Sequence, residues 1–454
     1  MEKIVSLCKR RGFVFPGSEI YGGLAGTFDY GPLGVALRNN IKALWWKRFV
    51  TDREDMYGMD AAILMNQNAW KASGHVGGFN DPLVEDLKTK KRYRADHLLE
   101  DVGVDVKGLT VGGMDSLIKE KGIKSPEGNP LGDVRQFNMM FKTHFGATEG
   151  EDSITYLRPE TAGGMFVNFK NIQDSFHPKL PFGMAQIGKA FRNEIAPRDF
   201  IFRLRELEQM EIEYFVDPRD PVKVDQIFNE WFDEQVAFLK DLGLPESKIH
   251  KLEVPEADRA HYSKRSVDTE FDFAIGQKEL LGLAYRTDFD LNAHASASGA
   301  DLSYYDEETK ERVVPHCIEP TFGVDRVLLA VLSSAYTEDE LGGETRTYLK
   351  FAPKVAPVIV AVSPLLKNKP ELVSLAREVF VQLKKKFGRV SFDDNGNIGK
   401  RYRRQDEIGT KWCVVIDFDT LEQKTGVTVR DRDTGEQTRM QVPELIAYIE
   451  EKLQ

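Results

Sequence analysis

Two charged runs of alternating residues, joined by a short loop, constrain the fold of this chain more than any other feature. The first run is Phe182 to Glu194 and the second is Phe202 to Phe215. Side chains alternate between the two faces of a strand, so each run would gather charged and amide groups on one face. Pro197 and Asp199, between the runs, suit a loop. The pattern predicts a long antiparallel hairpin with one face that cannot pack against an apolar core.

The cations and acids of this predicted hairpin are interleaved. They are Arg192, Glu194, Arg203, Arg205, Glu206 and Glu211. A solvated sheet face with ion pairs would explain such a pattern. A site that holds a polyphosphate and an ammonium group would explain it equally, because arginine binds phosphate oxygens in pairs and carboxylates bind amines.

Composition and length indicate an ordinary globular protein. The 454 residues are 41% hydrophobic and 30% charged, and that length allows about three domains of roughly 150 residues. No apolar run approaches the ~20 residues of a membrane span, and the opening MEKIVSLCKRRGF lacks the apolar core of a signal peptide. Three widely spaced cysteines without a CxxC argue against a disulfide framework and against a cysteine zinc site. We therefore expect a cytoplasmic protein that makes no membrane contact.

Charge is distributed unevenly along the chain. The net charge of −10 argues against an indiscriminate nucleic-acid coat. Residues 351–454, however, hold 18 Lys and Arg against 15 Asp and Glu. A contact with a polyanion must therefore be local, and the C-terminal part is the better candidate.

Two further segments combine strand and helix patterns with charged residues. TYLRPETAGGMFVNFKN (155–171) predicts a short strand that runs into a helix, where Glu160 is either a helix cap or a ligand. PHCIEPTFGVDRVLLAVLSSAY (315–336) predicts a strand that ends at Glu319 and a helix that begins near Phe322. Arg326 lies in the first turn of that helix, and helix N-termini attract anions.

The C-terminal part alternates strand and helix patterns from residue 351 onward, which predicts a small α/β domain with a partly parallel sheet. Its GNIGKRYRRQDEIG segment predicts a basic helix. That helix is either a solvated surface or a phosphate contact through Lys400, Arg401, Arg403 and Arg404.

Several of these segments together resemble one family. FRNE, followed by RLRELEQME, resembles motif 2 of the class II aminoacyl-tRNA synthetases. The sequence of this motif is closest in kind to that of the glycyl group. YGPLGVALRNNIKALWWKRFV resembles motif 1, a dimer-interface helix, and EPTFGVDR resembles motif 3. RPETAGG also matches the glycyl group, and the resemblance spans roughly residues 10–450.

The resemblance implies a class II catalytic domain over residues 1–350, an α+β fold built on an antiparallel sheet with flanking helices. It implies an insertion at about 98–150, a charged helical segment at about 217–265, and an α/β anticodon-binding domain over 351–454. The implied activity is activation of glycine with ATP and Mg²⁺, release of pyrophosphate, and transfer of glycine to the 3′ end of tRNA(Gly) by a homodimer.

Two other functions stay open from the sequence. One is another class II synthetase, for seryl, threonyl or prolyl transfer, against which RPETAGG and LEQMEIEYF argue. The other is a catalytically silent, synthetase-like protein that binds nucleic acid, against which Arg192, Glu194 and Arg326 argue. A class I synthetase is disfavoured because neither HIGH nor KMSKS occurs.

The resemblance also implies roles for single residues. Catalysis falls to Arg192 and Arg326. Glycine binding falls to Arg94, Glu160, Leu207, Glu208, Gln209, Met210, Glu211, Glu319, Thr321 and Gly323. ATP binding falls to Arg192, Asn193, Glu194, Phe202, Arg203, Leu204, Arg205, Glu206, Leu207, Glu279, Leu280, Gly323, Val324, Asp325 and Arg326, with Glu279 also the candidate Mg²⁺ ligand.

Two positions of the predicted site depart from the family pattern, and the insertion differs at two more. Leu207 lies where an aromatic usually stacks under adenine, and Thr321 replaces a more common serine. In the insertion, Ser125 and Gly128 stand where relatives often carry paired cysteines, so we expect no metal knuckle there. The role of the insertion stays open, and contact with the tRNA acceptor end is the family expectation.

Overall fold

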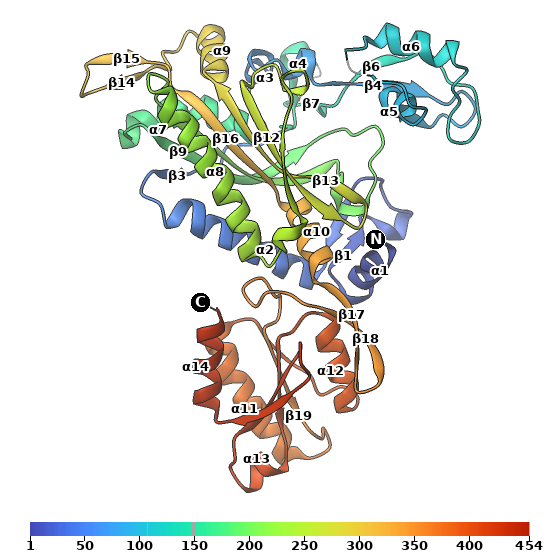
Figure 1. Cartoon of the computed structure of the whole chain (residues 1–454), viewed down its shortest axis with the longest axis vertical. Coiled ribbons are helices and arrows are strands. Elements are labelled where there is room, and N and C mark those ends of the chain that lie inside the picture. Colours follow the sequence, from blue (N-terminus) through green and yellow to red (C-terminus); the bar gives the residue numbers. More distant parts are fainter. Residues whose placement is uncertain (107, 148–149, 454) are drawn as a thin grey trace.

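The computed structural model describes residues 1–106, 108–147 and 150–453. A broad upper part holds most of the chain, and the C-terminal residues form a separate lower part (Figure 1). None of the described helices has the length and apolarity needed to cross a membrane.

A seven-stranded sheet organises the upper part, in the order β11-β12-β13-β16-β10-β9-β3. All neighbouring pairs are antiparallel except β3 and β9. The strands are β3 (Met56–Gly58), β9 (Phe182–Phe191), β10 (Glu206–Val216), β11 (Ile249–Glu253), β12 (Arg265–Phe273), β13 (Gly276–Thr287) and β16 (His316–Gly323). In the β9–β10 pair Phe182 lies opposite Phe215, which is the antiparallel hairpin that the two charged runs predict.

One face of this sheet is covered along its length. Even-numbered residues of β10, such as Met210 and Ile212, are fully buried in the main core. The helices that supply the other side of that core are α1 (Glu2–Arg11), α2 (Pro32–Trp46), α8 (Pro221–Asp241) and α10 (Val324–Ala335). Helix α2 carries the apolar stripe that its sequence spacing predicts, with Leu37, Ile41 and Trp45 fully buried.

The opposite face is covered at one end only. There α7 (Ala162–Phe176) and α9 (Phe289–Ser298) pack on Phe182, Phe215 and Cys317 in a second core. Beyond this core the same face carries Glu213, Glu211 and Gln209 along β10. Odd-numbered strand positions thus turn from apolar to charged along one strand, which locates a polar site on the uncovered part of the sheet.

The structure corrects several expected boundaries. Strand β9 ends at Phe191, so Arg192 and Glu194 follow it rather than belong to it. The charged segment 217–265 is helical only in α8, because Ile249–Glu253 forms the edge strand β11. Alternating residues in the segment 268–294 predict strands throughout, but its last part forms helix α9 instead. Strand β16 continues to Gly323, and α10 begins at Val324 instead of Phe322.

A compact module stands beside the sheet. It has a three-stranded sheet and two helices around their own apolar cluster (Figure 1). Its elements are β4 (Asn80–Glu85), β5 (Arg92–Arg94), α5 (Ala95–Glu100), α6 (Val111–Glu120) and β6 (Arg135–Asn138). The insertion expected at about 98–150 therefore shares a sheet and a core with residues that precede position 98.

Short elements connect these parts. They are β1 (Val14–Pro16), β2 (Phe28–Tyr30), α3 (Gln67–Ala72), α4 (His75–Gly78), β7 (Lys142–His144), β8 (Ile154–Tyr156), β14 (Tyr304–Asp306), β15 (Glu311–Val313), β17 (Tyr336–Leu341) and β18 (Glu344–Leu349).

The lower part is the α/β domain that the alternating pattern predicts. Its sheet has the order β20-β19-β21-β22-β23, with β19 parallel to both of its neighbours and the other pairs antiparallel. Its elements are β19 (Val360–Pro364), α11 (Pro370–Phe387), β20 (Val390–Phe392), α12 (Ile398–Glu407), β21 (Trp412–Ile416), α13 (Phe418–Glu422), β22 (Val427–Asp431), β23 (Gln437–Met440) and α14 (Val442–Leu453).

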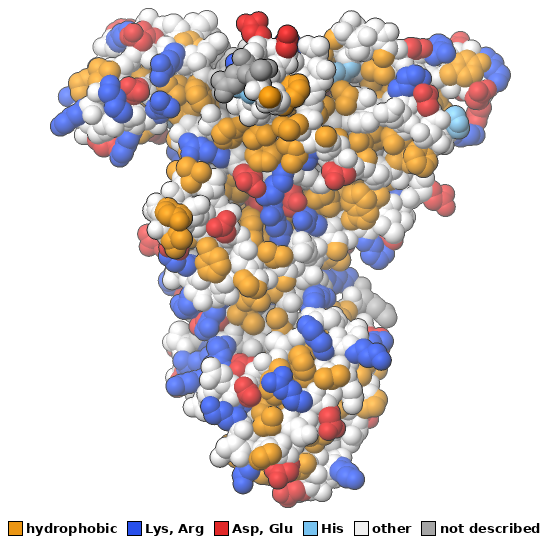
Figure 2. Space-filling model, turned by 180° about the vertical axis from the view of Figure 1, so that it is seen from behind, with side chains coloured by type: hydrophobic (Ala, Val, Ile, Leu, Met, Phe, Trp, Pro, Cys, Tyr) orange, Lys and Arg blue, Asp and Glu red, His pale blue; other side chains and the backbone are white. Residues whose placement is uncertain are grey.

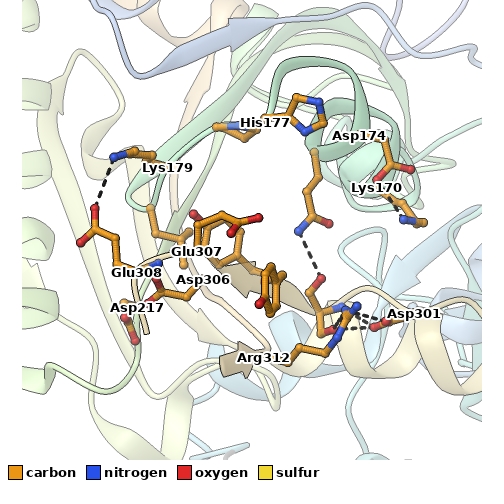
Figure 3. A pocket seen from close by; sticks show the side chains of 16 residues that line it. Lys170, Asp174, His177, Lys179, Asp217, Asp301, Asp306, Glu307, Glu308 and Arg312 are labelled. Atoms are coloured by element: carbon orange, nitrogen blue, oxygen red, sulfur yellow. Dashed lines mark hydrogen bonds and ion pairs between the residues drawn. The ribbon is translucent and has the colours of Figure 1, made fainter. Parts of the chain in front are cut away.

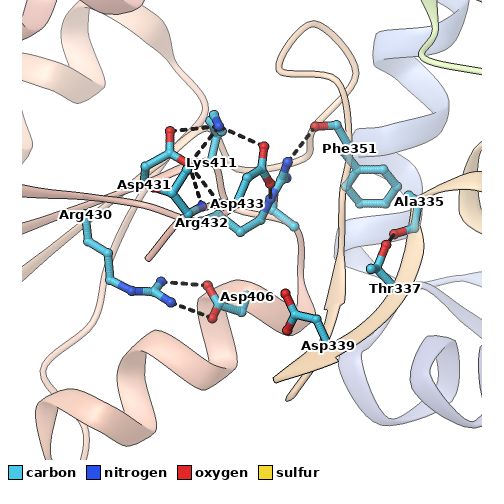
Figure 4. Close-up of polar contacts among 12 residues, drawn as sticks. Ala335, Thr337, Asp339, Phe351, Asp406, Lys411, Arg430, Asp431, Arg432 and Asp433 are labelled. Carbon is cyan, nitrogen blue, oxygen red and sulfur yellow. Dashed lines mark hydrogen bonds and ion pairs between the residues drawn. The ribbon is translucent and has the colours of Figure 1, made fainter. Parts of the chain in front are cut away.

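An ion-pair network joins the two parts. The Arg430 guanidinium donates two hydrogen bonds of 2.8 and 2.9 Å to Asp406 on α12 (Figure 4). Arg346, on β18, donates to the same carboxylate at 3.2 Å and to Asp339 on β17 at 2.7 and 2.8 Å. Arg432 donates to Phe351 O, at the start of the C-terminal part. We call these side chains, with Lys411, Asp431 and Asp433, the junction network.

Candidate functional site

A cavity of about 170 Å³ opens on the uncovered face of the sheet. Its lining comes from the ends of β9, β10, β13 and β16 and from the first turn of α10. The lining residues are Arg192, Glu194, Ile201, Phe202, Arg203, Leu204, Leu207, Glu208, Gln209, Glu279, Leu280, Gly282, Thr321, Gly323, Asp325 and Arg326. Most of the residues expected to bind ATP therefore meet in one hollow, although they come from four separate segments of the chain.

Three arginines line this cavity from different sides. Arg192 donates from Nε to Pro159 O at 3.0 Å, and its guanidinium lies 5.6 Å from the centroid of the Phe79 ring. Arg203 Nη1 is 3.8 Å from a Glu194 carboxylate oxygen. Such loosely held guanidiniums are suited to bind a polyanion, because their remaining donors are not committed to the protein.

The third arginine, Arg326, stacks on an aromatic ring. Its guanidinium lies 4.5 Å from the centroid of Phe202, and its Nη1 is 3.0 Å from a Glu279 carboxylate oxygen. The Arg326 charge overcomes burial and lowers the pKa of Glu279. Burial and the charge of Glu279 raise the pKa of nearby Asp268 to about 7.

A group of carboxylates adjoins the cavity on its inner side. Glu211 accepts hydrogen bonds from Thr161 N at 3.1 Å and from Thr321 Oγ1 at 3.1 Å. Arg286 donates from Nη1 to Glu319 at 2.8 Å, and Cys317 Sγ donates to Glu213 at 2.9 Å. We call Glu160, Glu211, Glu213 and Glu319 the acidic cluster.

The acidic cluster is strained electrostatically. Burial raises the pKa of Glu319 to about 8, and the charges of Glu211 and Glu160 add to that effect while Arg286 opposes it. Burial and the neighbouring carboxylates likewise raise the pKa of Glu211 and, much further, that of Glu213. At neutral pH the Glu319 carboxyl therefore favours its protonated form.

Glu160 behaves differently from the other members. Burial favours its neutral form, but His75, Arg286 and Arg192 together lower its pKa to about 2. His75 Nε2 lies 3.3 Å from the Glu160 carboxylate. Glu160 therefore stays ionised and gives the cluster a permanent negative charge beside the cavity.

Sequence reasoning missed Arg286, the cation at the centre of the cluster. Its side chain is buried, donates to Asp290 at 2.7 and 2.8 Å, and lies 3.9 Å from the centroid of the Tyr262 ring. The available signal was an arginine four residues before an aspartate, at the strand-to-helix boundary of LAYRTDFDL. Such spacing is common on protein surfaces, so only the fold distinguishes this buried pair.

Several expected site residues lie outside the cavity lining. Arg205 donates to the backbone oxygens of Glu194 and Ala25, and Asn193 N donates to Met139 O. Glu206 pairs with Lys189 at 2.7 Å on the exposed end of the hairpin. Met210 and Val324 belong to the main core on the other face of the sheet.

Arg94 also lies outside the lining. It pairs with Asp81 and Asp96 at 2.6 Å each, inside the module. Although burial lowers the pKa of Arg94, its hydrogen bond to Asp96 and the charges of Asp81, Asp96 and Glu194 raise it. The Arg94 guanidinium is therefore close to the rim of the cavity, where Glu194 lies, but is already engaged by two carboxylates.

Glu208 and Asp325 face helix α2. Glu208 pairs with Arg38 and Lys42 of α2, at 3.0 and 3.1 Å. Asp325 accepts from Glu208 N at 2.9 Å and from the hydroxyl of Tyr30. These contacts fix the cavity wall against the helix that resembles motif 1.

A larger cavity, of about 580 Å³, lies elsewhere, between the end of α7 and the β14–β15 hairpin (Figure 3). Its charged side chains are largely exposed and paired with one another, as Lys179 is with Glu308 and Arg312 with Asp301. If size were the criterion, this larger cavity would be chosen as the candidate functional site. The smaller cavity is the better candidate because its cations and buried carboxylates converge.

Charged side chains on the rear face of the upper part gather in the middle of the surface, among apolar ones (Figure 2).

The four residues of α12 that were expected to contact phosphate differ in their exposure. Lys400 and Arg403 are exposed, whereas Arg401 is buried and donates to the backbone oxygens of Pro364, Asp394 and Gly396. Arg404 pairs with Asp393 at 2.8 Å. A phosphate contact through Arg401 is therefore excluded by its burial.

Known families and proteins match this chain over its whole length. A model described as "tRNA synthetase class II core domain (G, H, P, S and T)" matches residues 141–335, and one described as "Anticodon binding domain" matches residues 359–452. The glycine–tRNA ligase of Bacillus cereus (strain ZK / E33L) is 51% identical over 462 residues, which cover 100% of this chain and 99% of the relative. That of Geobacillus kaustophilus (strain HTA426) is 52% identical over 466 residues, with the same coverage. That of Caldanaerobacter subterraneus subsp. tengcongensis is 49% identical over 461 residues, which cover 100% of this chain and 98% of the relative.

The chain belongs to the glycine–tRNA ligase family.

Membership of this family confirms the resemblance that the motifs indicate, and with it the class II catalytic fold followed by an anticodon-binding domain. ATP is a substrate of such synthetases, which agrees with a cavity lined by three arginines. Both departures from the family pattern, Leu207 and Thr321, line this cavity. Thr321 donates its hydroxyl hydrogen to Glu211, as the more common serine could.

Proposed function

We propose that this protein activates glycine with ATP and then transfers it to the 3′ end of tRNA(Gly). The observation that carries the proposal is the adjacency of the arginine-lined cavity to the buried acidic cluster, in which burial raises the pKa of Glu319 to about 8. The cavity suits a triphosphate and the cluster suits a small ammonium group. A glycine placed with its amino group in the cluster would direct its carboxylate toward Arg192.

The residues of the cavity then have distinct tasks. Arg192 holds the glycine carboxylate and the α-phosphate, so that the ionised carboxylate attacks phosphorus without a general base. Arg203 and Arg326 hold the remaining phosphates, and Phe202 supports Arg326 from behind. Binding of ATP requires Arg326 to exchange Glu279 for phosphate oxygens.

Glu279 is the residue that we propose for Mg²⁺. Mg²⁺ in nucleotide sites takes one or two carboxylates and completes its shell with phosphates and water. Glu279 lies opposite Glu270 in the β12–β13 pair and close to Asp268, so oxygen donors are present. Among the described residues no group of three or more His, Cys, Asp or Glu could hold a metal alone, which fits an ion that arrives with ATP. When bound, the ion would neutralise phosphate charge.

Selection of glycine must be steric in this arrangement. Glycine has no side chain to bind, and a pocket gains only about 1–3 kcal/mol per added methylene. Glu211 is held by donors on two sides, and the Thr321 methyl adds bulk next to it. We propose that this crowding leaves no space for the methyl group of alanine.

The wider assembly is also part of the proposal. Residues 1–350 would form the catalytic domain and 351–454 the anticodon-binding domain, with Lys400 and Arg403 on its tRNA-facing surface. Ile20, Tyr21 and Leu24 are strongly exposed apolar residues close to α2, which supports a homodimer through this end of the molecule. The cytoplasmic location expected from the sequence stays a prediction.

Amino-acid-dependent exchange of pyrophosphate into ATP, without tRNA, tests the activity. We expect exchange with glycine, and better exchange with serine or alanine would reassign the substrate. Replacing Arg192 with alanine should reduce exchange at least about a hundredfold without a change in thermal stability. Arg198→Ala, in the same loop but outside the cavity lining, is the matched control. A protein that binds tRNA and shows no exchange with any amino acid would be the silent relative.

A further inference from the structure

Each ionised or acidic group around the glycine amino site needs a partner that fixes its position. Glu211 is fixed by Thr161 and Thr321, and Glu319 by Arg286. Glu160 lies in the irregular segment between β8 and α7, where hydrogen bonds at Pro159 O and Thr161 N hold the backbone on either side of it. Its carboxylate is held by the contact with His75.

His75 is itself held on several sides. Its Nδ1 is 2.8 Å from Ser73 Oγ, and its ring packs edge-on against Trp70 with centroids 5.4 Å apart. The backbone oxygen of His75 accepts from Asn138 Nδ2, on β6 of the module, at 3.3 Å. Contacts with Trp70 of α3, with Ser73 directly after it and with Asn138 of the module thus hold the imidazole toward Glu160.

The hydrogen-bond geometry indicates which ring nitrogen carries the proton. Ser73 has one hydroxyl hydrogen and two neighbours, His75 Nδ1 at 2.8 Å and Trp70 O at 3.4 Å. The Ser73 hydroxyl can donate to either neighbour, so this contact does not fix the role of Nδ1. An ionised Glu160 carboxylate can only accept, so the proton facing it is on Nε2. Nε2 then donates to Glu160, which is the direction that an ionised carboxylate requires.

We propose that Ser73 and His75 form a relay that positions Glu160 to accept the ammonium group of glycine. The relay rests on the proposed function, because it needs Glu160 to bind glycine. A donor on a ring that is held in place orients the carboxylate toward the substrate. A lysine or arginine at position 75 would put a permanent positive charge on a flexible side chain beside Glu160 and compete with the substrate ammonium. His75 is therefore a positioning residue and not a catalytic one.

The same segment reaches the other end of the substrate. Phe79 lies below the Arg192 guanidinium, and its backbone oxygen accepts from Met139 N at 3.0 Å. Residues 73–79 thus contact Glu160 through His75 and Arg192 through Phe79. A short segment between α3 and β4 would in this way set the distance between the amino and carboxylate ends of glycine.

The test compares three substitutions at position 75 by KM for glycine, KM for ATP and kcat in pyrophosphate exchange. His75→Ala should raise KM for glycine about tenfold to a hundredfold, the range for a lost hydrogen bond to a charged group, and leave KM for ATP within about twofold. His75→Gln, which keeps an N–H donor at similar reach, should recover most of the loss. His75→Lys should bind glycine no better than His75→Ala.

Two controls separate the relay from its premise. His144→Ala removes an exposed histidine with the same kind of serine contact, at 2.9 Å from Ser153, and should change nothing. Glu160→Gln should raise KM for glycine at least as much as His75→Ala. If Glu160→Gln has no effect, the assignment of Glu160 to glycine is wrong and the relay falls with it. If Glu160→Gln weakens glycine but the lysine and glutamine variants at position 75 behave alike, the relay alone is overturned.

Discussion

Two buried groups of charges in this molecule have opposite balances. The junction network matches four cations with four carboxylates: Arg346, Arg430, Arg432 and Lys411 against Asp339, Asp406, Asp431 and Asp433. In the acidic cluster, four glutamates and Asp290 lie around the buried guanidinium of Arg286, and His75 and Arg192 act on Glu160. The first group has equal numbers of cations and carboxylates, whereas around Arg286 the carboxylates outnumber the cations.

The difference shows how a structural ion pair can be distinguished from a binding site. In the junction network, hydrogen bonds from Arg346 lower the pKa of Asp339, which is the response of a satisfied pair. In the acidic cluster, burial and like charges raise the pKa of Glu319 to about 8. A carboxylate whose pKa is raised in this way is a candidate for a binding site, as we propose for glycine.

The largest effect should come from breaking the balanced group. Asp406→Asn leaves the guanidiniums of Arg346 and Arg430 buried without their shared acceptor charge. Removing one partner of a buried ion pair costs about 3–5 kcal/mol, so the free energy of unfolding in a urea titration should fall by that amount. Asp419→Asn, in the same domain but mostly exposed, is the control. Equal stability of both variants would show that the junction network is not a stabilising contact.

In the acidic cluster, by contrast, the protein's stability and its KM for glycine should depend on pH. The pKa of Glu319 is about 8 in the folded protein against an ordinary 4.5, so folded protein keeps a proton between these values that unfolded protein has lost. Stability therefore falls as pH rises through this window. Because the glycine ammonium replaces that proton, KM for glycine should fall as pH rises from 6 to 8, by up to about tenfold per unit. Glu319→Gln should flatten the dependence, and a flat profile in the unaltered protein would contradict the assignment.

A smaller effect is expected on α12, where a buried cation, Arg401, and two exposed cations, Lys400 and Arg403, lie on one helix. Arg403 pairs there with exposed Glu344. Lys400→Ala combined with Arg403→Ala should weaken tRNA binding about tenfold and reduce its salt dependence, since each phosphate contact releases counterions. Arg401→Ala should lower stability instead, because its guanidinium holds three backbone oxygens. Filter binding at several salt concentrations measures the first outcome and thermal melting the second. Equal tRNA affinity of the double variant would exclude this face of α12 from the tRNA contact.

The same helix shows what the sequence can and cannot predict. The alternation in β9 and β10, the apolar stripe of α2 and the strand–helix order after residue 351 all follow from local periodicity, and the structure confirms them. Arg401 and Arg403 look equivalent in sequence, because burial depends on which strand or loop lies opposite the helix. For the same reason Arg205, which holds backbone oxygens, could not be separated from Arg192, which lines the cavity.

Arg286 and His75 illustrate a second limit of prediction from sequence, which concerns contacts between distant residues. Both lie far in sequence from the residues they serve, 33 positions from Glu319 and 85 from Glu160. Local patterns report which face of an element is buried, and they carry no information on such distant pairings. The motifs pointed to most of the residues that line the cavity, whereas groups such as His75 and the buried Arg286 appeared only in the folded structure.

The smallest effect is expected within the acidic cluster, at Glu213. Burial and the charges of Glu319 and Glu211 raise its pKa well above the ordinary value, which favours its neutral form. Glu213→Gln then replaces one neutral group by another of the same shape, and the free energy of unfolding should change by less than about 1 kcal/mol. Urea titration at pH 7 measures it, with Asp406→Asn as the contrast.

The Glu213 result decides how the cluster is charged. Among the described residues, nothing donates to Glu213 Oε1, while Cys317 donates to Oε2. A protonated carboxyl explains this asymmetry, because only one of its oxygens is then an acceptor that needs a donor. A loss of more than about 2 kcal/mol in Glu213→Gln would mean that Glu213 is ionised and paired with Arg286. Arg286 would then be neutralised within the fold, and the site would be balanced in the way that the junction network is.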